Sequence, residues 1–422
     1  MKIALLNTDD YSGGAAVACI RLGETLIAKG HEVKMFTLNS NGKHSFVEPL
    51  VKSFWTKSIA RINFVLERLY FLFFEKNKSI RFAFSPANFG FDITQSFDFK
   101  DFDIIHIHWI NFGFLSINDL EKLFSLKKPV VWTLHDMWAF TGGCHHSGDC
   151  ENYQEHCGYC VSYLKNPSQN DLSFLQLAKK KEVYQDFPIT VVGCSEWIAN
   201  RAAKSTVFRE KKVVAIPNPL DLETFKPTKV EKEEFGLEKN KKYILIAAMK
   251  VTVIWKGFSL LKESLKILYS LLEDSEKEEI EILVAGDANP LDFEDIPFKT
   301  NLLGKINSSQ EMNKVYNLAE VFVSSSIQEN LPNTIMEAMA TGTPCVAFGV
   351  GGIPEMIEHK KTGYLAEPKN SEDLAEGIRF VLKNNSAKIK IDCIQKIVSS
   401  YSKEIVAKLY LDIYESLIFK IY

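Results

Sequence analysis

Short apolar runs alternate with longer amphipathic stretches along most of the 422-residue chain. The first run, residues 2–8, is followed by a polar turn and by a helical pattern over 15–28 that ends before Gly30. Strands that alternate with helices predict parallel sheets built from crossover connections. Further strands are predicted in the first half at residues 33–38, 104–108, 130–134, 189–193 and 213–216, and helices at 117–125, 172–184 and 196–204.

The alternation stops at Pro217-Asn218-Pro219 and the Lys/Glu-rich residues 226–242, and then it restarts. We therefore expect an α/β protein with an N-terminal domain over residues 1–216 and a C-terminal domain over 217–400, both doubly wound. The amphipathic tail, 401–422, is expected to pack back on the first domain. Ligands of such sheets bind beyond the carboxyl ends of the strands, so the loops there should line a central cleft. Strands are predicted in the second half at residues 243–249, 280–285, 301–303, 321–324 and 345–348, and helices at 258–272, 308–318, 333–340 and 372–383.

Composition excludes several classes of protein. A hydrophobic fraction of 46% with 24% charged residues is typical of a globular chain and excludes a disordered one. The net charge of −3 provides no overall attraction to nucleic acid. No apolar run reaches the roughly 20 residues that cross a bilayer, and the apolar run near the N-terminus is too short for a signal peptide. We expect a cytoplasmic protein that binds no nucleic acid.

Two glycine- or lysine-containing loops are candidates for binding phosphate. Gly13-Gly14 follows the first strand and precedes a helix, where backbone amides can approach an oxyanion. A plain tight turn is the alternative, and the missing G-x-G-x-x-G pattern disfavours a dehydrogenase. Lys250 and Lys256 follow the first strand of the second domain, where a cation and helix amides converge on anions. The alternative for these lysines is solvent exposure.

Two glutamates are candidates for binding hydroxyl groups. Glu329 and Glu337 stand eight residues apart, in the loop and helix that follow the strand predicted at 321–324. Carboxylates accept hydrogen bonds from the vicinal hydroxyls of sugars and ribose. The alternative is one charge at a helix N-terminus and one on the surface.

At this point a family resemblance appears. Residues 324–347, which contain both glutamates and continue through Thr341-Gly342-Thr343-Pro344, resemble the signature of retaining glycosyltransferase family 4. Other segments match the same family in order along nearly the whole chain. They are Gly13-Gly14, residues 216–225, Lys256-Gly257-Phe258, residues 284–287 and residues 349–364.

The resemblance implies the GT-B fold, with two Rossmann-like domains, and a nucleotide-sugar donor such as a UDP- or GDP-sugar. Glu337 should hold the ribose, Glu329 the donor sugar and Lys256 the diphosphate. The family arginine that precedes this lysine is replaced here by Val251, and Lys250 is the nearest cation. The donor-binding residues implied are Gly13, Gly14, Lys250, Lys256, Gly304, Asn330, Leu331 and Glu337.

Histidines end two predicted strands. His135 resembles the family histidine that reaches the donor sugar, so His135 and Glu329 are the expected catalytic residues. A structural role is the alternative for a histidine at a strand end. His106 and His108 alternate on one strand and face the same side, where we expect them in the core or behind the site.

Four cysteines lie within seventeen residues, at Cys144, Cys150, Cys157 and Cys160. Four thiolates satisfy tetrahedral Zn²⁺, and the last two have the spacing of a zinc knuckle. We expect a structural zinc, with free thiols or redox disulfides as alternatives, and no cofactor for catalysis. Residues 132–160 also resemble a family subgroup of bacterial polysaccharide-building enzymes.

Residues 51–84 carry seven basic residues, two acidic residues and nine aromatics. One interpretation is a helix in the core with a solvated edge. The other is a peripheral surface that meets anionic lipid and a polyprenyl-diphosphate acceptor.

The function predicted is transfer of a sugar, with retention, from a nucleotide sugar to a saccharide or lipid-linked saccharide in cell-surface polysaccharide biosynthesis. Such an enzyme would work in the cytoplasm or at the inner face of the membrane. The alternatives are a nucleotide-sugar epimerase on a similar fold and a non-catalytic two-lobed sugar-binding protein.

Overall fold

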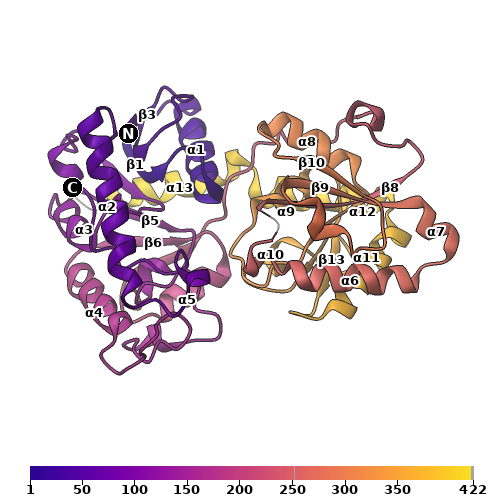
Figure 1. Ribbon diagram of the computed structural model, residues 1–422. Helices are drawn as coiled ribbons and strands as arrows, with labels where there is room; N and C mark the ends of the chain where they lie inside the picture. The colour runs from indigo at the N-terminus through magenta and orange to yellow at the C-terminus, as the bar shows by residue number, and fades with distance from the viewer. Residues whose placement is uncertain (251, 420–422) are drawn as a thin grey trace. The chain divides into compact units, whose positions relative to one another are not determined.

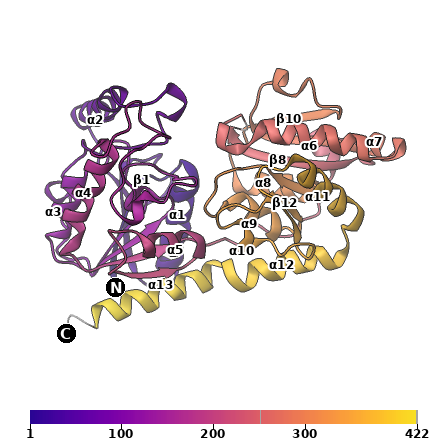
Figure 2. The ribbon, with the colours of Figure 1, turned by 90° about the horizontal axis from the view of Figure 1, so that it is seen from below.

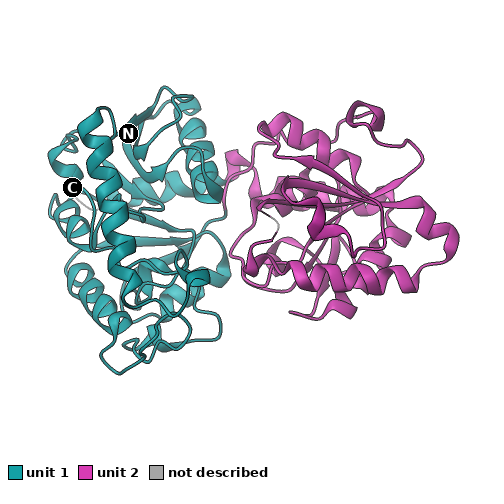
Figure 3. Cartoon of the chain, in the orientation of Figure 1, with its two compact units in different colours: residues 1–217, 406–422 teal, residues 218–405 magenta. Residues whose placement is uncertain are grey.

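The computed structural model describes residues 1–250 and 252–419 and divides into two compact units (Figures 1 and 3). Unit 1 is Met1–Pro217 together with the residues from Val406 onward, and unit 2 is Asn218–Ile405. Each unit contains one sheet whose strands are all parallel. The prediction of two parallel-sheet α/β domains is therefore confirmed.

The sheet of unit 1 has seven strands in the order β3-β2-β1-β4-β5-β6-β7. The strand order reverses direction between β1 and β4, which is the switch point at which doubly wound sheets bind ligands. Strands β4, β5 and β6 are buried at every position, as expected for continuous apolar runs covered on both faces. The strands are β1 (Lys2–Asp9), β2 (Glu32–Asn39), β3 (Val47–Pro49), β4 (Ile104–Ile107), β5 (Val130–Leu134), β6 (Ile189–Gly193) and β7 (Lys212–Ala215).

The last helix of the chain, α13 (Lys403–Ile418), belongs mostly to unit 1. Its buried face, which includes Tyr410 and Tyr414, packs in one hydrophobic cluster with Leu5 of β1 and Val131 of β5. Figure 2 shows α13 running along the lower edge of unit 1 in that view. The other helices of unit 1 are α1 (Gly13–Ala28), α2 (Phe54–Leu72), α3 (Ile117–Phe124), α4 (Leu172–Gln185) and α5 (Glu196–Lys204).

The sheet of unit 2 has six strands in the order β10-β9-β8-β11-β12-β13. Its switch point lies between β8 and β11. The strands are β8 (Lys242–Lys250), β9 (Ile280–Asp287), β10 (Thr300–Gly304), β11 (Val321–Ser324), β12 (Cys345–Phe348) and β13 (Gly363–Ala366). The helices are α6 (Phe258–Leu271), α7 (Asp274–Glu279), α8 (Ser309–Leu318), α9 (Asn333–Ala340), α10 (Ile353–Met356), α11 (Ser371–Asn384) and α12 (Ala387–Tyr401).

Short 3₁₀ turns connect several of these elements. Two of them carry residues of interest, namely η3 (Trp138–Phe140) after β5 and η6 (Ile254–Lys256) after β8. Across residues 1–250 and 252–419, we find no helix with the length and apolar character needed to cross a bilayer.

Candidate active site

The switch point of unit 2 is built from the loops that follow β8 and β11. The Ile327 amide donates a hydrogen bond to the Trp255 carbonyl at 2.9 Å. The Ser325 hydroxyl donates to the Lys256 carbonyl at 2.8 Å. Gly257 has φ +65°, and a Cβ added there would lie 2.1 Å from the Ser325 carbonyl oxygen. The two loops are therefore held together so closely that only glycine fits at this position.

Lys256 and Glu329 meet across this switch point. The Lys256 ammonium forms an ion pair with Oε1 of Glu329. The hydroxyl of Ser326 donates to the same oxygen at 3.1 Å. The two paired side chains are 34% and 16% exposed respectively, so a ligand can reach the cation from solvent while the carboxylate stays largely covered.

The two residues after Glu329 are fixed by a glycine loop. Gly351 has φ +59°, and an added Cβ would lie 1.7 Å from the Glu329 carbonyl oxygen. The Gly352 amide donates to the Asn330 carbonyl at 2.8 Å. Asn330 and Leu331 are both buried. The loop after β12 thus fixes the backbone on which Glu329 stands.

Glu337 lies one turn into α9 and is 9% exposed. The Tyr316 hydroxyl donates to its Oε2 at 3.0 Å. A buried carboxylate that is bound by a neutral hydroxyl keeps acceptor capacity for further hydroxyl donors. The family pattern predicted the position of this glutamate, whereas its partner on α8 carried no recognisable signal.

Two further donor-binding candidates of unit 2, Lys250 and Gly304, lie at the carboxyl ends of strands β8 and β10. Lys250 is exposed at the last residue of β8. Val251, at the place of the family arginine, lies outside the described residues. Gly304 ends β10, an edge strand that is separated from the switch point by β9 and β8. The structure thus brings Lys256 and Glu329 into contact and places Gly304 further along the same edge of the sheet.

The switch point of unit 1 joins the loops after β1 and β4. Thr8 donates from its amide to the Trp109 carbonyl at 2.7 Å and from its hydroxyl to the Asn111 carbonyl at 3.0 Å. Gly13, with φ +81°, is the first residue of α1. Oδ1 of Asp9 accepts hydrogen bonds from the amides of Tyr11 and Ser12. Gly13-Gly14 therefore opens a helix beside the histidine-bearing strand ends, as its position after the first strand predicted.

Three histidines line the carboxyl ends of β4 and β5. His135 Nε2 lies 2.9 Å from Nδ1 of His108, and burial lowers the pKa of His135 to about 4. His106 is fully buried and contacts the hydroxyls of Tyr414 and Thr133 through its two ring nitrogens. Burial lowers the pKa of His106 to about 3, so both rings are neutral near pH 7. His106 lies in the core and His108 directly behind His135.

Asp136 contacts three residues of the loops around His135, a role that we did not predict. Its Oδ2 lies 2.7 Å from Nδ1 of His145 and accepts from the Trp109 indole at 2.7 Å, while Oδ1 accepts from the Trp138 amide. Burial opposes ionisation of Asp136, yet His145 and the Trp138 amide hold its pKa at about 2. His145 Nε2 in turn lies 2.9 Å from the Ser85 hydroxyl.

Ser85, His145 and Asp136 are linked in the same order as the side chains of a hydrolase triad. Ser85 is only 1% exposed, however, so a substrate cannot reach its hydroxyl. The arrangement instead anchors the loop that carries His145. The adjacent pair His135-Asp136 at a strand end was the one sequence signal that could have indicated this network.

Two family models match consecutive parts of the chain. Residues 12–224, just over half of the chain, match the model described as Glycosyltransferase Family 4. Residues 229–396 match the model described as Glycosyl transferases group 1. The chain belongs to glycosyltransferase family 4.

Relatives of this glycosyltransferase extend over nearly its full length. It is 26% identical to an uncharacterized glycosyltransferase of Methanocaldococcus jannaschii, with 98% of each chain covered. It is 23% identical to the putative colanic acid biosynthesis glycosyl transferase WcaC of Escherichia coli, with 85% of each chain covered.

Solved structures share the fold of the glycosyltransferase. Sucrose-phosphate synthase from Thermosynechococcus elongatus matches with a TM-score of 0.68 at 17% identity, covering 99% of both chains. HepE of Anabaena in complex with UDP-glucose matches with a TM-score of 0.65 at 15% identity, covering 99% of this chain and 100% of that one. The predicted GT-B fold is confirmed.

The four clustered cysteines of the glycosyltransferase follow Asp136 in the chain. Cys144, Cys157 and Cys160 are partly buried, Cys150 is exposed, and none of the four forms a disulfide. Within the part of the chain that the structure describes, no three Cys, His, Asp or Glu side chains stand ready to hold a metal ion. A zinc site here stays a prediction.

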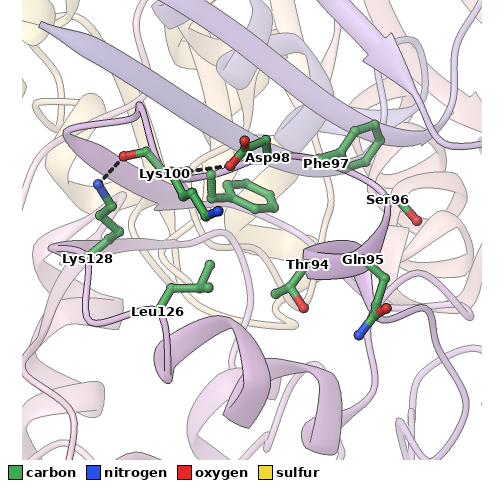
Figure 4. A pocket seen from close by; sticks show the side chains of 9 residues that line it. Thr94, Gln95, Ser96, Phe97, Asp98, Lys100, Leu126 and Lys128 are labelled. Atoms are coloured by element: carbon green, nitrogen blue, oxygen red, sulfur yellow. Dashed lines mark hydrogen bonds between the residues drawn. The ribbon is translucent and has the colours of Figure 1, made fainter.

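One pocket of unit 1 lies away from this chemistry. It has a volume of about 340 Å³ and is lined by residues that include Phe97, Lys100 and Lys128 (Figure 4). These residues precede β4 and β5, so the pocket is at the amino ends of the strands. A second, smaller pocket at the carboxyl ends contains His108, Asn111, His135 and Asp136. The smaller pocket thus contains His135, one of the two residues expected to be catalytic.

Proposed function

We propose that this glycosyltransferase takes its sugar from a nucleoside diphosphate sugar, either a UDP- or a GDP-sugar. The observation that carries the proposal is the Lys256–Glu329 pair at the switch point of unit 2. At this point the Lys256 ammonium can bind a diphosphate. The Glu329 carboxylate can then accept hydrogen bonds from sugar hydroxyls. The relative HepE, which was solved with UDP-glucose, supports a uridine donor.

Each candidate residue then has one role. Glu337 binds the ribose hydroxyls, Glu329 binds hydroxyls of the transferred sugar with the amides of Asn330 and Leu331, and Lys256 neutralises the diphosphate. For unit 1, we assign phosphate binding to the amides of Gly13 and Gly14 and binding of the transferred sugar to His135. Because the His135 ring is neutral, it can orient a hydroxyl without repelling positive charge that develops on the sugar.

We infer that transfer retains the anomeric configuration. The bond between the anomeric carbon and the leaving phosphate oxygen breaks, and a bond from that carbon to the acceptor oxygen forms on the same face. The proton of the acceptor hydroxyl passes to the leaving phosphate. This route requires no protein nucleophile, which agrees with a site whose carboxylates bind hydroxyls.

We assign the acceptor to saccharides or lipid-linked saccharides of a cell-surface polysaccharide. The similarity to WcaC, named for colanic acid biosynthesis, supports this assignment. An epimerase and a non-catalytic sugar-binding protein are disfavoured because the relatives are named as transferases.

Calorimetric titration with UDP and GDP tests the donor assignment. Glu337→Gln should weaken binding by about 10- to 100-fold, since a hydrogen bond to a charged group contributes about 1.5–3 kcal/mol. Glu358→Gln, which removes a surface carboxylate paired with Lys361, is the matched control and should bind like the native chain. Equal affinity of native chain and Glu337→Gln variant would remove the ribose assignment.

Proton NMR of the product formed from a UDP-sugar and a saccharide acceptor tests the reaction. Retention predicts the same anomeric configuration in donor and product. An inverted product would contradict the mechanism, and conversion of the donor without acceptor would favour the epimerase.

A further inference from the structure

Helix α2 presents large apolar side chains to solvent along its whole length. Its buried face includes Ala60, Glu67, Arg68 and Phe71. On the other side, Phe54 and Trp55 are 77% and 76% exposed, and Phe73, directly after the helix, is 70% exposed. The exposed apolar residues are Phe54, Trp55, Ile59, Ile62, Val65, Leu66, Leu69, Leu72 and Phe73, which we call the α2 face. Figure 1 shows α2 running across the front of unit 1.

The α2 face is one continuous stripe. At about 100° per residue, its nine members fall within an arc of roughly 140°. The helices of soluble proteins normally carry polar residues on the face that points away from the core. A second apolar face opposite the core is instead typical of helices that lie in the interface of a bilayer.

The exposed charges beside the α2 face all have one sign. Within residues 52–82, all of which the structure describes, the exposed charged side chains are Lys52, Lys57, Arg61, Lys76 and Lys78. Both acidic residues of this segment are buried. Glu67 accepts from the amides of Ala87 and Asn88, and Glu75 pairs with Arg81. Both acids are therefore buried and hydrogen-bonded or paired, and the only exposed charged side chains of the segment are cations.

The cations are available to an anionic partner. Lys52 pairs with Glu48. No ion pair within 4 Å is found for Lys57, Arg61, Lys76 or Lys78 among residues 1–250 and 252–419. The Lys76 ammonium donates to the carbonyl of Val161, which is itself 63% exposed. The 159–161 loop thus adds further exposed apolar surface at the end of α2.

We propose that the α2 face docks the enzyme on an anionic lipid bilayer. The apolar stripe enters the boundary between headgroups and acyl chains, and the flanking cations bind lipid phosphates. A second copy of the chain is a poorer occupant, because two such faces would bring like charges together. The proposal is independent of the identity of the sugar donor.

Co-sedimentation of the full chain with vesicles tests this docking. The chain should bind vesicles of equal parts phosphatidylcholine and phosphatidylglycerol, and added salt should weaken the binding. Trp55 is the most exposed tryptophan of the described chain, so its fluorescence should shift to shorter wavelength on binding. Trp55→Phe should keep binding and lose most of that shift.

Variants separate the apolar and charged contributions. The double variant Phe54→Ser and Trp55→Ser should lower vesicle affinity at least tenfold. Lys57→Gln with Arg61→Gln should lower it roughly 30-fold for the anionic vesicles, at about fivefold for each cation removed. Ile391→Ser with Val398→Ser, which removes exposed apolar residues of α12, is the control and should bind like the native chain.

Every variant should retain the native melting temperature, because the changed side chains are exposed. Absence of sedimentation with these anionic vesicles would overturn the proposal. So would concentration-dependent dimers that the Phe54→Ser and Trp55→Ser variant abolishes, since the face would then belong to a second copy.

Discussion

The imidazole Nδ1 of His106 lies 2.7 Å from the hydroxyl of Tyr414, which follows it by 308 positions in the chain. This contact fastens α13 to β4 in the core of unit 1. The other ring nitrogen of His106 lies 2.8 Å from the Thr133 hydroxyl, which also contacts Tyr410. The carboxyl ends of β4 and β5, where His108 and His135 meet, are therefore supported by the last helix of the chain.

Replacing Tyr414 with phenylalanine should destabilise unit 1. Tyr414→Phe leaves a buried nitrogen of His106 without its partner, which costs about 1–3 kcal/mol of unfolding free energy. Urea denaturation measures this loss. Tyr159→Phe, on a 60% exposed side chain, should change the unfolding free energy by less than about 0.5 kcal/mol. A Tyr414→Phe variant as stable as the control would show that the contact contributes nothing.

Stability should fall as the pH drops from about 6.5 toward 4. Burial lowers the pKa of His135 to about 4, of His106 to about 3, and of His108 well below its ordinary value. In this range the unfolded chain binds protons at these histidines and the folded chain does not. The unfolding free energy therefore rises with pH, by up to about 1.4 kcal/mol per pH unit for each histidine.

Denaturation at a series of pH values between 4 and 7 measures the slope. His106→Gln removes one of the three groups, so its slope near pH 5 should be smaller by about 1.4 kcal/mol per pH unit. An unchanged slope would mean that His106 titrates alike in the folded and unfolded chain.

Gly257→Ala should disrupt the donor site of unit 2. Its added Cβ would lie 2.1 Å from the Ser325 carbonyl, so the loop that carries Lys256 must move away from the β11 loop. Gly236 has nearly the same backbone, φ +68° against +65°, but open space around its Cβ. Gly236→Ala should therefore lose only about 1 kcal/mol of stability, the cost of the left-handed conformation.

Calorimetric titration with UDP compares the two glycine variants. Gly236→Ala should bind UDP like the native chain, and Gly257→Ala should bind at least tenfold more weakly. Equal affinities would show that the close contact of the two loops does not position Lys256.

The fold was largely predictable because the strands of both sheets are short apolar runs separated by polar turns. Strands β3 and β13 and helices α7, α10 and α12 were missed. β13 is only four residues long and begins with Gly363, and α12 carries a weaker pattern with several exposed apolar residues. Whether a short segment forms a strand or a helix depends on its contacts with neighbouring elements of the fold. The local sequence pattern does not contain those contacts.

The candidate site was predictable only in part. The family pattern gave the positions of Lys256, Glu329 and Glu337, since each lies in a motif. It could not give the Tyr316 contact to Glu337 or the Asp136 network, because those partners come from separate elements and meet only in the folded chain. Long-range contacts between single polar residues leave no periodic signal in the sequence.

Purified protein should contain one zinc ion per chain, bound by Cys144, Cys150, Cys157 and Cys160. Four thiolates leave the metal with no open position, so the ion would be structural. Lys180, which is fully buried, interacts electrostatically with Cys144 and Cys157, and its ammonium would offset part of the negative charge of a four-thiolate site.

Elemental analysis measures the zinc content. The Cys157→Ser and Cys160→Ser double variant should lose the ion, whereas Cys19→Ala, a buried thiol elsewhere in unit 1, should keep it. Native protein without stoichiometric zinc, when prepared in the absence of chelator, would exclude the site and leave four reduced thiols.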